Sequence, residues 1–180
     1  MNKKYQLIKN EYATFYRSLM KQGRLPTKDT GIGFWGPSIP DEVYEAFRKI
    51  GLRKCRSFLD LGSGDGKITL IASLFSKYSY GIEYDQELHK KASELQSKLG
   101  IKNVRFVNDD FMKYDLSKYD IIFCSPDKPM ERGLGKKLEK ELKGKLVLQG
   151  HHFHPANLKK GKSFRVNDML FTVYSKSKKK

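Results

Sequence analysis

The sequence predicts a doubly wound α/β fold, in which helices cover both faces of a mostly parallel sheet. Strand-like and helix-like segments alternate from Arg56 to Gln149, and this alternation is typical of parallel strands joined by helical crossovers. A glycine-rich loop over Gly62–Gly66 joins the first of these strands to a helix. The last stretch, Ser163–Tyr174, has the pattern of an antiparallel hairpin with its turn at Asn167-Asp168.

Two helices are expected before this alternating region. Residues 5–22 carry apolar and aromatic side chains at helical spacing, and Gly23 is expected to end the helix. A second helix is expected to begin at Pro40, with Asp41 placed to cap it. Residues 24–38 lie between these helices, are rich in glycine and proline, and are expected to form a loop.

Inside the alternating region, the apolar runs predict strands over residues 56–61, 79–83, 104–107, 119–124 and 145–149. The segments between them predict helices over residues 67–75, 86–99 and 130–142. Asp85 is placed to cap the second of these helices, and Gly100 and Gly144 follow the ends of the second and third. A ligand is expected at the carboxyl ends of the strands, where the strand order reverses.

Size and composition indicate one domain with flanking segments. The chain has 180 residues, which we divide into an N-terminal helix and lid-like loop (1–38), a main domain (39–175) and a basic tail (176–180). Its apolar runs are shorter than the ~20 residues that cross a bilayer, so no membrane partner is expected. Cys55 and Cys124 stand far apart in the sequence, which favours a reducing, cytoplasmic location.

The charge balance bears on the partners of the chain. Its 36 Lys and Arg residues exceed its 20 Asp and Glu residues, which gives a formal net charge of +16. Such an excess attracts polyanions such as RNA, and acidic proteins. A lysine-rich composition gives the same excess without any polyanionic partner, so the charge alone leaves both interpretations open.

The most informative segment is the loop after the first strand, Asp60-Leu61-Gly62-Ser63-Gly64-Asp65-Gly66. Glycines at alternate positions let the backbone turn sharply and approach a ligand closely. A dinucleotide-binding loop needs a small residue where Lys67 stands, and the carboxylate of Asp60 would repel a pyrophosphate. The same carboxylate suits a ligand that carries an ammonium and a sulfonium group.

Acidic residues also follow the next two strands. Glu83 lies at the end of the second strand, about 20 residues after the loop, which is the offset at which an acid reaches ribose hydroxyls. Asp110 follows the third strand, where a carboxylate can accept a hydrogen bond from an adenine amino group. Asp60, Glu83 and Asp110 together indicate a positively charged ligand that contains a nucleoside.

This series of motifs resembles the class I methyltransferases that use S-adenosylmethionine. The resemblance implies a Rossmann-like sheet of seven strands, the last antiparallel, and S-adenosylmethionine as the cofactor. It implies that Asp60 and the loop hold the methionine part, that Glu83 binds the ribose, and that Asp110 binds adenine beside Phe111. The full set of expected cofactor-binding residues is Asp60, Gly62, Ser63, Gly64, Gly66, Glu83, Tyr84, Asp109, Asp110 and Phe111.

A narrower resemblance extends from about Phe34 to Phe153. Over this range the chain is similar to the small archaeal protein-lysine methyltransferases and their mitochondrial relatives. The shared features are Pro37-Ser38, the glycine loop with Lys67-Ile68, Gly81-Ile82-Glu83, Leu138-Glu139-Lys140-Glu141-Leu142-Lys143 and Gly150-His151-His152-Phe153. The resemblance implies a protein lysine side chain as the methyl acceptor, and the N-terminal helix lies outside it.

The acceptor is expected to meet the segment after the fourth strand, and Ser125, Pro126 and Asp127 are the candidate catalytic residues. Methyltransferases of base or amide nitrogens often carry Asn, Asp or Ser, then Pro-Pro and an aromatic residue here. Asp127 and Lys128 replace the second half, so the platform that would stack a flipped base is missing. Asp127 can orient a lysine ammonium or cap the next helix. An RNA methyltransferase and a non-catalytic cofactor-binding protein are the competing hypotheses.

Further candidates lie around this predicted site. Trp35 either caps the core beneath its loop or forms a wall for the cofactor or the acceptor. His151 is expected at the rim of the active site. With His152 and His154 it forms a group of histidines, but no acid or cysteine lies close in sequence to complete a metal site, so no metal is expected. Cys124 is interpreted as a small buried hydrophobe and not as a nucleophile.

Overall fold

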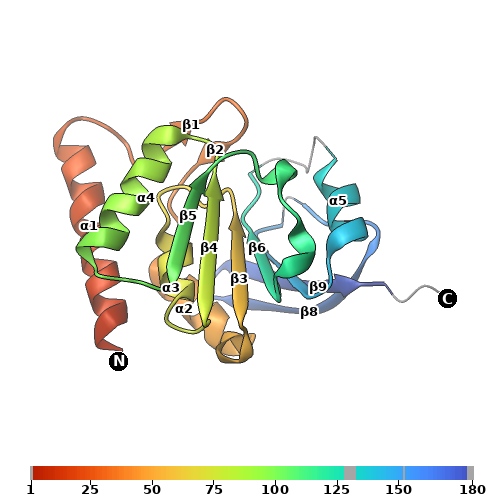
Figure 1. Cartoon of the computed structure of the whole chain (residues 1–180). Helices are drawn as coiled ribbons and strands as arrows, with labels where there is room; N and C mark the ends of the chain where they lie inside the picture. Colours follow the sequence, from red (N-terminus) through yellow and green to blue (C-terminus); the bar gives the residue numbers. More distant parts are fainter. Residues whose placement is uncertain (1, 128–132, 152, 178–180) are drawn as a thin grey trace.

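The computed structural model describes residues 2–127, 133–151 and 153–177, and a seven-stranded sheet lies at its centre (Figure 1). The strands are β3 (Ser57–Leu61), β4 (Tyr78–Glu83), β5 (Val104–Asn108), β6 (Ile121–Cys124), β7 (Lys145–Gln149), β8 (Leu158–Val166) and β9 (Met169–Lys176). Their order across the sheet is β5-β4-β3-β6-β7-β9-β8. Each predicted strand of the alternating region is therefore present in this sheet.

The strands β3 to β7 run parallel, and the C-terminal hairpin adds the antiparallel pairs. β3 pairs in parallel with both β4 and β6, while β9 is antiparallel to β7 and to β8. The chain builds outward from β3 to β5 on one side and then returns to β6 on the other. The strand order therefore reverses between β3 and β6, where sheets of this kind bind their ligands. The predicted fold class, including the antiparallel last strand, is confirmed.

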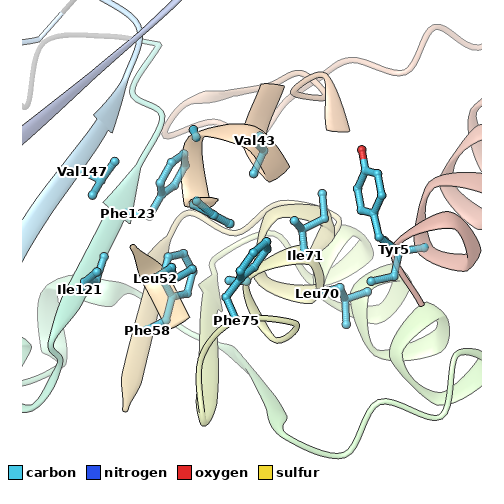
Figure 2. Packing of buried hydrophobic residues seen from close by; sticks show 14 of the residues in the cluster. Tyr5, Val43, Leu52, Phe58, Leu70, Ile71, Phe75, Ile121, Phe123 and Val147 are labelled. Carbon is cyan, nitrogen blue, oxygen red and sulfur yellow. The ribbon is translucent and has the colours of Figure 1, made fainter. Parts of the chain in front are cut away.

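One face of the sheet is covered by helices from the first half of the chain, namely α1 (Lys3–Lys21), α2 (Pro40–Lys49), α3 (Lys67–Ala72) and α4 (Gln86–Lys98). Figure 2 shows Phe58 and Phe123 of the sheet among the buried residues of this layer. Phe47 of α2 belongs to this layer, and its ring centroid lies 5.3 Å from that of Phe58 and 5.8 Å from that of Phe123. These edge-to-face contacts bury large aromatic surfaces and stabilise the layer.

The opposite face is covered by the short helix η3 (Leu116–Lys118) and by α5 (Leu134–Glu141). Neighbouring residues of one strand serve the two faces, as the pleat of a strand requires. In β3, Phe58 packs in the first cluster and Leu59 in the second. In β6, likewise, Phe123 packs in the first cluster and Ile122 in the second.

The N-terminal helix α1 is docked on the domain, and its position corrects one prediction. Tyr5, Ile8 and Tyr12 are buried in the first cluster. Asp41 is not the N-cap of α2: Ile39 holds that position, with no side-chain cap. The Asp41 carboxylate instead accepts hydrogen bonds from Tyr5 Oη and Lys9 Nζ. The Asp41 side chain therefore makes a tertiary contact with α1 and does not cap α2 as the local sequence pattern predicted.

The glycine-rich segment before α2 contains two short strands that the sequence did not predict. β1 (Lys28–Asp29) and β2 (Phe34–Trp35) form an antiparallel hairpin. Its turn is closed by the backbone of Thr30, whose N–H donates to Gly33 O at 2.9 Å. We call residues 28–35 the lid hairpin.

Several element boundaries differ from the prediction. α3 ends at Ala72 instead of residue 75, and the C-terminal strands are longer than Ser163–Tyr174. The short helices η1 (Leu52–Lys54) and η2 (Phe111–Lys113) were not predicted. The predicted cap Asp85 is confirmed, because its Oδ1 accepts from Leu88 N at 3.0 Å. Residues 130–132 of the predicted helix 130–142, and the end of the basic tail, lie outside the described residues.

Candidate active site

A cavity of about 230 Å³ opens at the carboxyl end of the sheet, where the strand order reverses. Its walls come from the glycine loop after β3, the ends of β4 and β6, the segment after β5 and the lid hairpin. The predicted site residues that line it are Trp35, Gly62, Ser63, Gly64, Glu83, Tyr84, Asp110, Phe111, Ser125, Pro126 and Asp127. Most of the predicted cofactor set and the whole candidate catalytic segment thus meet in one place.

Four predicted residues lie outside the lining of this cavity: Asp60, Gly66, Asp109 and His151. A Cβ on Gly66 would lie 2.5 Å from Phe106 Cζ and 2.6 Å from Ala92 Cβ, so this glycine lets the loop pack closely against β5 and α4. The Asp109 carboxylate accepts from Lys113 Nζ at 2.7 Å. Gly66 is therefore used for packing, and the Asp109 carboxylate for a local charge pair.

The backbone of Gly64 lies at the centre of the loop and is tightly enclosed. Its φ is +55°, a conformation that L side chains rarely adopt. Its N–H donates to Glu83 Oε2 at 2.7 Å, which ties the loop to the end of β4. A Cβ at this position would lie 2.5 Å from Trp35 Cδ1. Glycine is therefore required both by the backbone conformation and by the indole ring above it.

Glu83 is buried at the end of β4 and keeps acceptor capacity for a ligand. Its Oε1 accepts from Asp85 N at 2.8 Å, and its Oε2 accepts from Gly64 N. Burial raises its pKa, while these backbone hydrogen bonds act in the opposite direction. Each carboxylate oxygen can accept a further bond, which suits the two hydroxyl groups of a ribose.

Asp60 lies beneath the loop and acts on the cavity through its charge. It is 2% exposed, and Thr69 Oγ1 donates to its Oδ2 at 2.9 Å. Burial raises its pKa to about 7, and the charges of Glu83 and Asp65 act in the same direction. Its negative charge below the loop favours a cationic ligand in the cavity.

The remaining polar groups fit a nucleoside ligand. The hydroxyl of Ser63, a residue that lines the cavity, is buried and has no hydrogen-bond partner among the described residues. Buried polar atoms are rarely left without a partner, so this oxygen is free to bond a ligand. Asp110 caps η2 through Met112 N at 3.0 Å, which fixes it beside Phe111 at the cavity wall.

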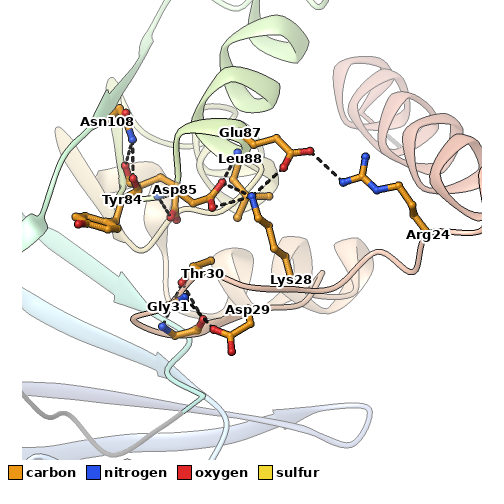
Figure 3. A network of polar contacts seen from close by, with 12 residues as sticks. Arg24, Lys28, Asp29, Thr30, Gly31, Tyr84, Asp85, Glu87, Leu88 and Asn108 are labelled. Atoms are coloured by element: carbon orange, nitrogen blue, oxygen red, sulfur yellow. Dashed lines mark hydrogen bonds and ion pairs between the residues drawn. The ribbon is translucent and has the colours of Figure 1, made fainter.

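The lid hairpin is held over the cavity by charged contacts with the start of α4 (Figure 3). Lys28 Nζ lies 2.8 Å from both Asp85 Oδ2 and Glu87 Oε2, and Arg24 also pairs with Glu87 at 3.0 Å. Burial acts to raise the pKa of Asp85, but the hydrogen bonds from Lys28 and from the backbone of Leu88 outweigh it and lower this pKa. Asp85 thus caps α4 and fixes the lid at the same time.

Asp127 joins the end of β6 to the lid hairpin. Its Oδ2 accepts from the backbone N–H of Phe34 at 2.6 Å, and its Oδ1 lies 3.4 Å from the position of a Cβ on Gly33. The alternative role of a helix cap concerns residues 128–132, which lie outside the described residues. Asp127 and Ser125 are exposed at the mouth of the cavity.

The thiol of Cys124 is not available as a nucleophile. Burial raises its pKa to about 12, and the charges of Asp60 and Asp127 add to this effect. A thiol with this pKa is protonated at neutral pH, and the thiolate is the reactive form. This agrees with its interpretation as a small buried hydrophobe.

Sequence reasoning missed three residues that meet at the glycine loop. Lys67 lines the cavity and is 2% exposed. Its Nζ lies 4.7 Å from the ring centroid of Tyr16 and 5.7 Å from that of Tyr12. Both tyrosines come from α1, and no local sequence signal indicates where that helix docks.

Within the described part of the chain, no cluster of three or more His, Cys, Asp or Glu residues is arranged to hold a metal. His154 Nδ1 lies 2.5 Å from Tyr174 Oη. His151 is exposed, and His152 lies outside the described residues.

Among the described helices, none combines the length and the apolar character that crossing a bilayer requires.

The fold is similar to that of solved methyltransferases. An RNA methyltransferase of Salinibacter ruber in complex with S-adenosyl-L-homocysteine superposes with a TM-score of 0.65 and 19% identity, over 81% of this chain and 96% of that one. The putative methyltransferase yhhF of Escherichia coli gives 0.60 and 20%, over 76% and 85%. An S-adenosylmethionine-dependent methyltransferase of Aquifex aeolicus gives 0.55 and 21%, over 74% and 88%.

Sequence comparisons point to one family. An uncharacterized protein of Methanothermobacter thermautotrophicus is 35% identical over 84 residues, which cover 46% of this chain and 33% of that protein. The match thus spans about a third of that relative's length. The model of the ANTKMT methyltransferase domain matches residues 60–162, more than half of the chain, and begins at the acid before the glycine loop. The chain therefore belongs to the family of the ANTKMT methyltransferase domain.

Proposed function

We propose that the domain transfers a methyl group from S-adenosylmethionine to the side-chain nitrogen of protein lysines. The charge of the cavity lining carries this proposal. Among the described residues, the lining contains the carboxylates of Asp65, Glu83, Asp110 and Asp127, with Lys67 as its basic side chain. Such a lining attracts a lysine ammonium and repels the phosphates of a nucleic acid.

The placement of the cofactor follows from the strand ends. We assign adenine to the wall formed by Asp110 and Phe111, and the ribose to Glu83, whose carboxylate keeps acceptor capacity. The methionine part then lies along the glycine loop, close to Ser63, with Asp60 beneath it. This arrangement directs the methyl group toward the end of β6, where Ser125 and Asp127 are exposed.

Bound S-adenosylmethionine supplies an electrophilic methyl group on a sulfonium. The protein must align a neutral amine with it, and alignment contributes much of the rate enhancement in such displacements. The Asp127 carboxylate is positioned to orient an incoming lysine ammonium and to accept its proton. Its bond to Phe34 N uses one lone pair of Oδ2, so further acceptor sites remain.

The mouth of the cavity suits the alkyl part of a lysine side chain. Phe34 is 54% exposed and Ile32 is 43% exposed, and both line the cavity at the lid hairpin. Exposed apolar side chains at a cavity mouth provide a surface for the methylenes of a long side chain. The apolar side chains at the cavity mouth, together with the acidic groups of the lining, favour lysine over a nucleobase as the acceptor.

RNA is the second candidate acceptor, and two observations favour it. The formal net charge of +16 attracts polyanions, and Ser125-Pro126 matches half of the motif found in enzymes that methylate base nitrogens. The acidic lining opposes this candidate, because a phosphate close to the cavity would meet several carboxylates.

Label transfer into a whole-cell extract distinguishes the two acceptors. The chain is incubated with extract and methyl-labelled S-adenosylmethionine, and the products are divided into a nuclease-treated and a protease-treated half. We expect the label to survive nuclease and to be lost after protease. Label that survives protease and is lost to nuclease would identify RNA as the acceptor and overturn the proposal.

The matched control uses the same chain without a functional cofactor site. Glu83→Ala removes the proposed ribose acceptor and should weaken cofactor binding, so its label incorporation should fall to background. Label transfer by this variant at the rate of the intact chain would mean that the extract's own enzymes supply the signal.

A further inference from the structure

Lys67 is an unusual residue for the wall of a ligand cavity. Its side chain is almost fully enclosed by protein, and its ammonium faces the rings of Tyr16 and Tyr12. Asp65 influences it through charge, but the Asp65 carboxylate is itself bound by Tyr16 Oη at 2.5 Å and by the Lys67 backbone N–H at 3.3 Å. The ammonium therefore has N–H donors that these aromatic contacts do not use.

A cation in this position is costly unless an anion accompanies it. Burial lowers the pKa of Lys67 to about 8, while the charge of Asp65 acts in the opposite direction. The aromatic faces compensate for part of the lost hydration. A ligand anion that enters the cavity would supply the missing partner.

The backbone of the glycine loop offers few donors to such an anion. The N–H groups of Gly62 and Ser63 both donate to Ile82 O at 3.0 Å, and that of Gly66 donates to Ser63 O at 2.9 Å. The N–H of Gly64 is bound to Glu83. A ligand carboxylate beside this loop therefore depends on a side-chain donor, and Lys67 is the basic side chain that lines the described cavity.

We infer that Lys67 binds the carboxylate of the methionine part of S-adenosylmethionine, and that Tyr12 and Tyr16 of α1 hold its side chain in place. This inference rests on the cofactor placement proposed above. It gives α1 a function in the site: the helix supplies the aromatic wall behind Lys67. Tyr12 Oη also donates to the backbone oxygen of Asp65 at 2.7 Å, so the helix positions the loop as well.

Two ligands that differ only in the carboxylate test this inference. Titration calorimetry compares S-adenosylmethionine with decarboxylated S-adenosylmethionine for the intact chain and for Lys67→Met, which keeps an unbranched side chain without the charge. The intact chain should prefer the carboxylated ligand by roughly 10- to 100-fold, as expected for hydrogen bonds to a charged group. Lys67→Met should bind the two ligands within about twofold of each other.

Lys91→Met is the matched control variant. Lys91 Nζ also lies over an aromatic ring of α1, 5.0 Å from the centroid of Phe15, but it does not line the cavity. This variant should keep the full preference for the carboxylated ligand. Thermal unfolding should show one cooperative transition for Lys67→Met, which establishes that the variant is folded.

A second measurement follows the protons that are taken up on binding. At about pH 9, above the Lys67 pKa of about 8, the free protein holds this amine mostly neutral. Binding of S-adenosylmethionine to the intact chain should take up a proton that its binding to Lys67→Met does not, as measured by calorimetry in buffers of different ionisation enthalpy. Equal proton uptake by the intact chain and by Lys67→Met would contradict the inference.

The remaining outcomes are distinguishable. A Lys67→Met variant that keeps the full preference, or that loses affinity for both ligands equally, overturns the inference and leaves the cofactor placement intact. If the intact chain binds both ligands equally tightly, the inference is also overturned and the cofactor placement stays intact. An intact chain that binds neither ligand overturns the cofactor placement together with the role of Lys67.

Discussion

Gly64 is the residue on which the shape of the cavity depends most directly. Its φ is positive, and a Cβ added to it would lie only 2.5 Å from Trp35 Cδ1, so there is no room for a side chain. We expect Gly64→Ala to displace the indole or the loop and to weaken cofactor binding by roughly 10-fold or more, as overpacking costs about 1–3 kcal/mol. Calorimetry with S-adenosylhomocysteine measures this loss.

Gly100→Ala is the control for this prediction. Gly100 has a φ of +62°, but a Cβ there would meet no atom within 4 Å. This variant shares the backbone strain without the contact with Trp35, so its cofactor affinity should be unchanged. The same affinity in Gly64→Ala and Gly100→Ala would show that the loop does not contact the ligand.

Asp60 predicts how cofactor affinity depends on pH. Its pKa of about 7 lies well above the ordinary value of 3.8 because the group is buried. As the pH falls through 7, Asp60 gains a proton and its attraction for the cationic ligand is lost. Affinity for S-adenosylmethionine should therefore fall between pH 8 and about pH 6, and Asp60→Asn should remove this dependence.

The same carboxyl group affects stability with the opposite sign. Because its folded-state pKa exceeds the unfolded value, the folded state binds the proton more tightly, and stability falls as the pH rises from about 4 to about 7. Asp60→Asn should thus raise the unfolding free energy at pH 8, by on the order of 1–4 kcal/mol.

The binding prediction for Asp60 has its own test. If Asp60→Asn binds S-adenosylmethionine as tightly as the intact chain at pH 8, Asp60 has no electrostatic role in binding.

Residue roles could be predicted where they depend on local sequence. Asp85 precedes an amphipathic helix and caps it as expected. Asp41 also precedes a helical run, but its carboxylate bonds to Tyr5 and Lys9, which are more than 30 positions away in sequence. Lys67 was missed for the same reason, because its aromatic contacts come from the distant helix α1.

At the scale of elements, the lid hairpin is the part most open to a direct test. Trp35, the single tryptophan of the chain, is half-buried against the glycine loop. We expect its fluorescence to change when S-adenosylhomocysteine binds. Lys28→Met removes two ion pairs of the lid and should weaken ligand binding by roughly two- to thirtyfold, since exposed pairs contribute roughly 0.2–1 kcal/mol each.

Arg48→Met controls for the loss of a surface ion pair, because Arg48 pairs with Glu45 and does not line the site cavity. Its fluorescence titration should match that of the intact chain. A tryptophan signal that stays constant while calorimetry shows ligand saturation would mean that the lid neither moves nor touches the cofactor.

Elements were predictable where periodicity marks them. The strand over residues 145–149 was placed at its observed bounds, and the others within a few residues, because buried parallel strands are continuous apolar runs. The lid strands β1 and β2 have two residues each, and the lid is held by Asp127, whose bond to Phe34 spans 93 positions. A pattern this short gives no periodicity to detect.

At the scale of the whole molecule, the charge is unevenly divided. The chain carries +16 in total, and β8 exposes Lys159, Lys160 and Lys162, whereas carboxylates outnumber basic side chains in the lining of the described cavity. Net charge could be read from the sequence, but it describes association and not the site. The acidic cavity became visible only when strand ends far apart in sequence were brought together.

The chemical identity of the methylated atom distinguishes a lysine acceptor from a nucleic acid. Macromolecules labelled by the chain with methyl-labelled S-adenosylmethionine are separated from free cofactor, hydrolysed completely and resolved by chromatography against methylated amino acids and nucleosides. We expect the label to co-elute with Nε-methylated lysine. Label in a methylated nucleoside, with none in methyl-lysine, would contradict the proposal.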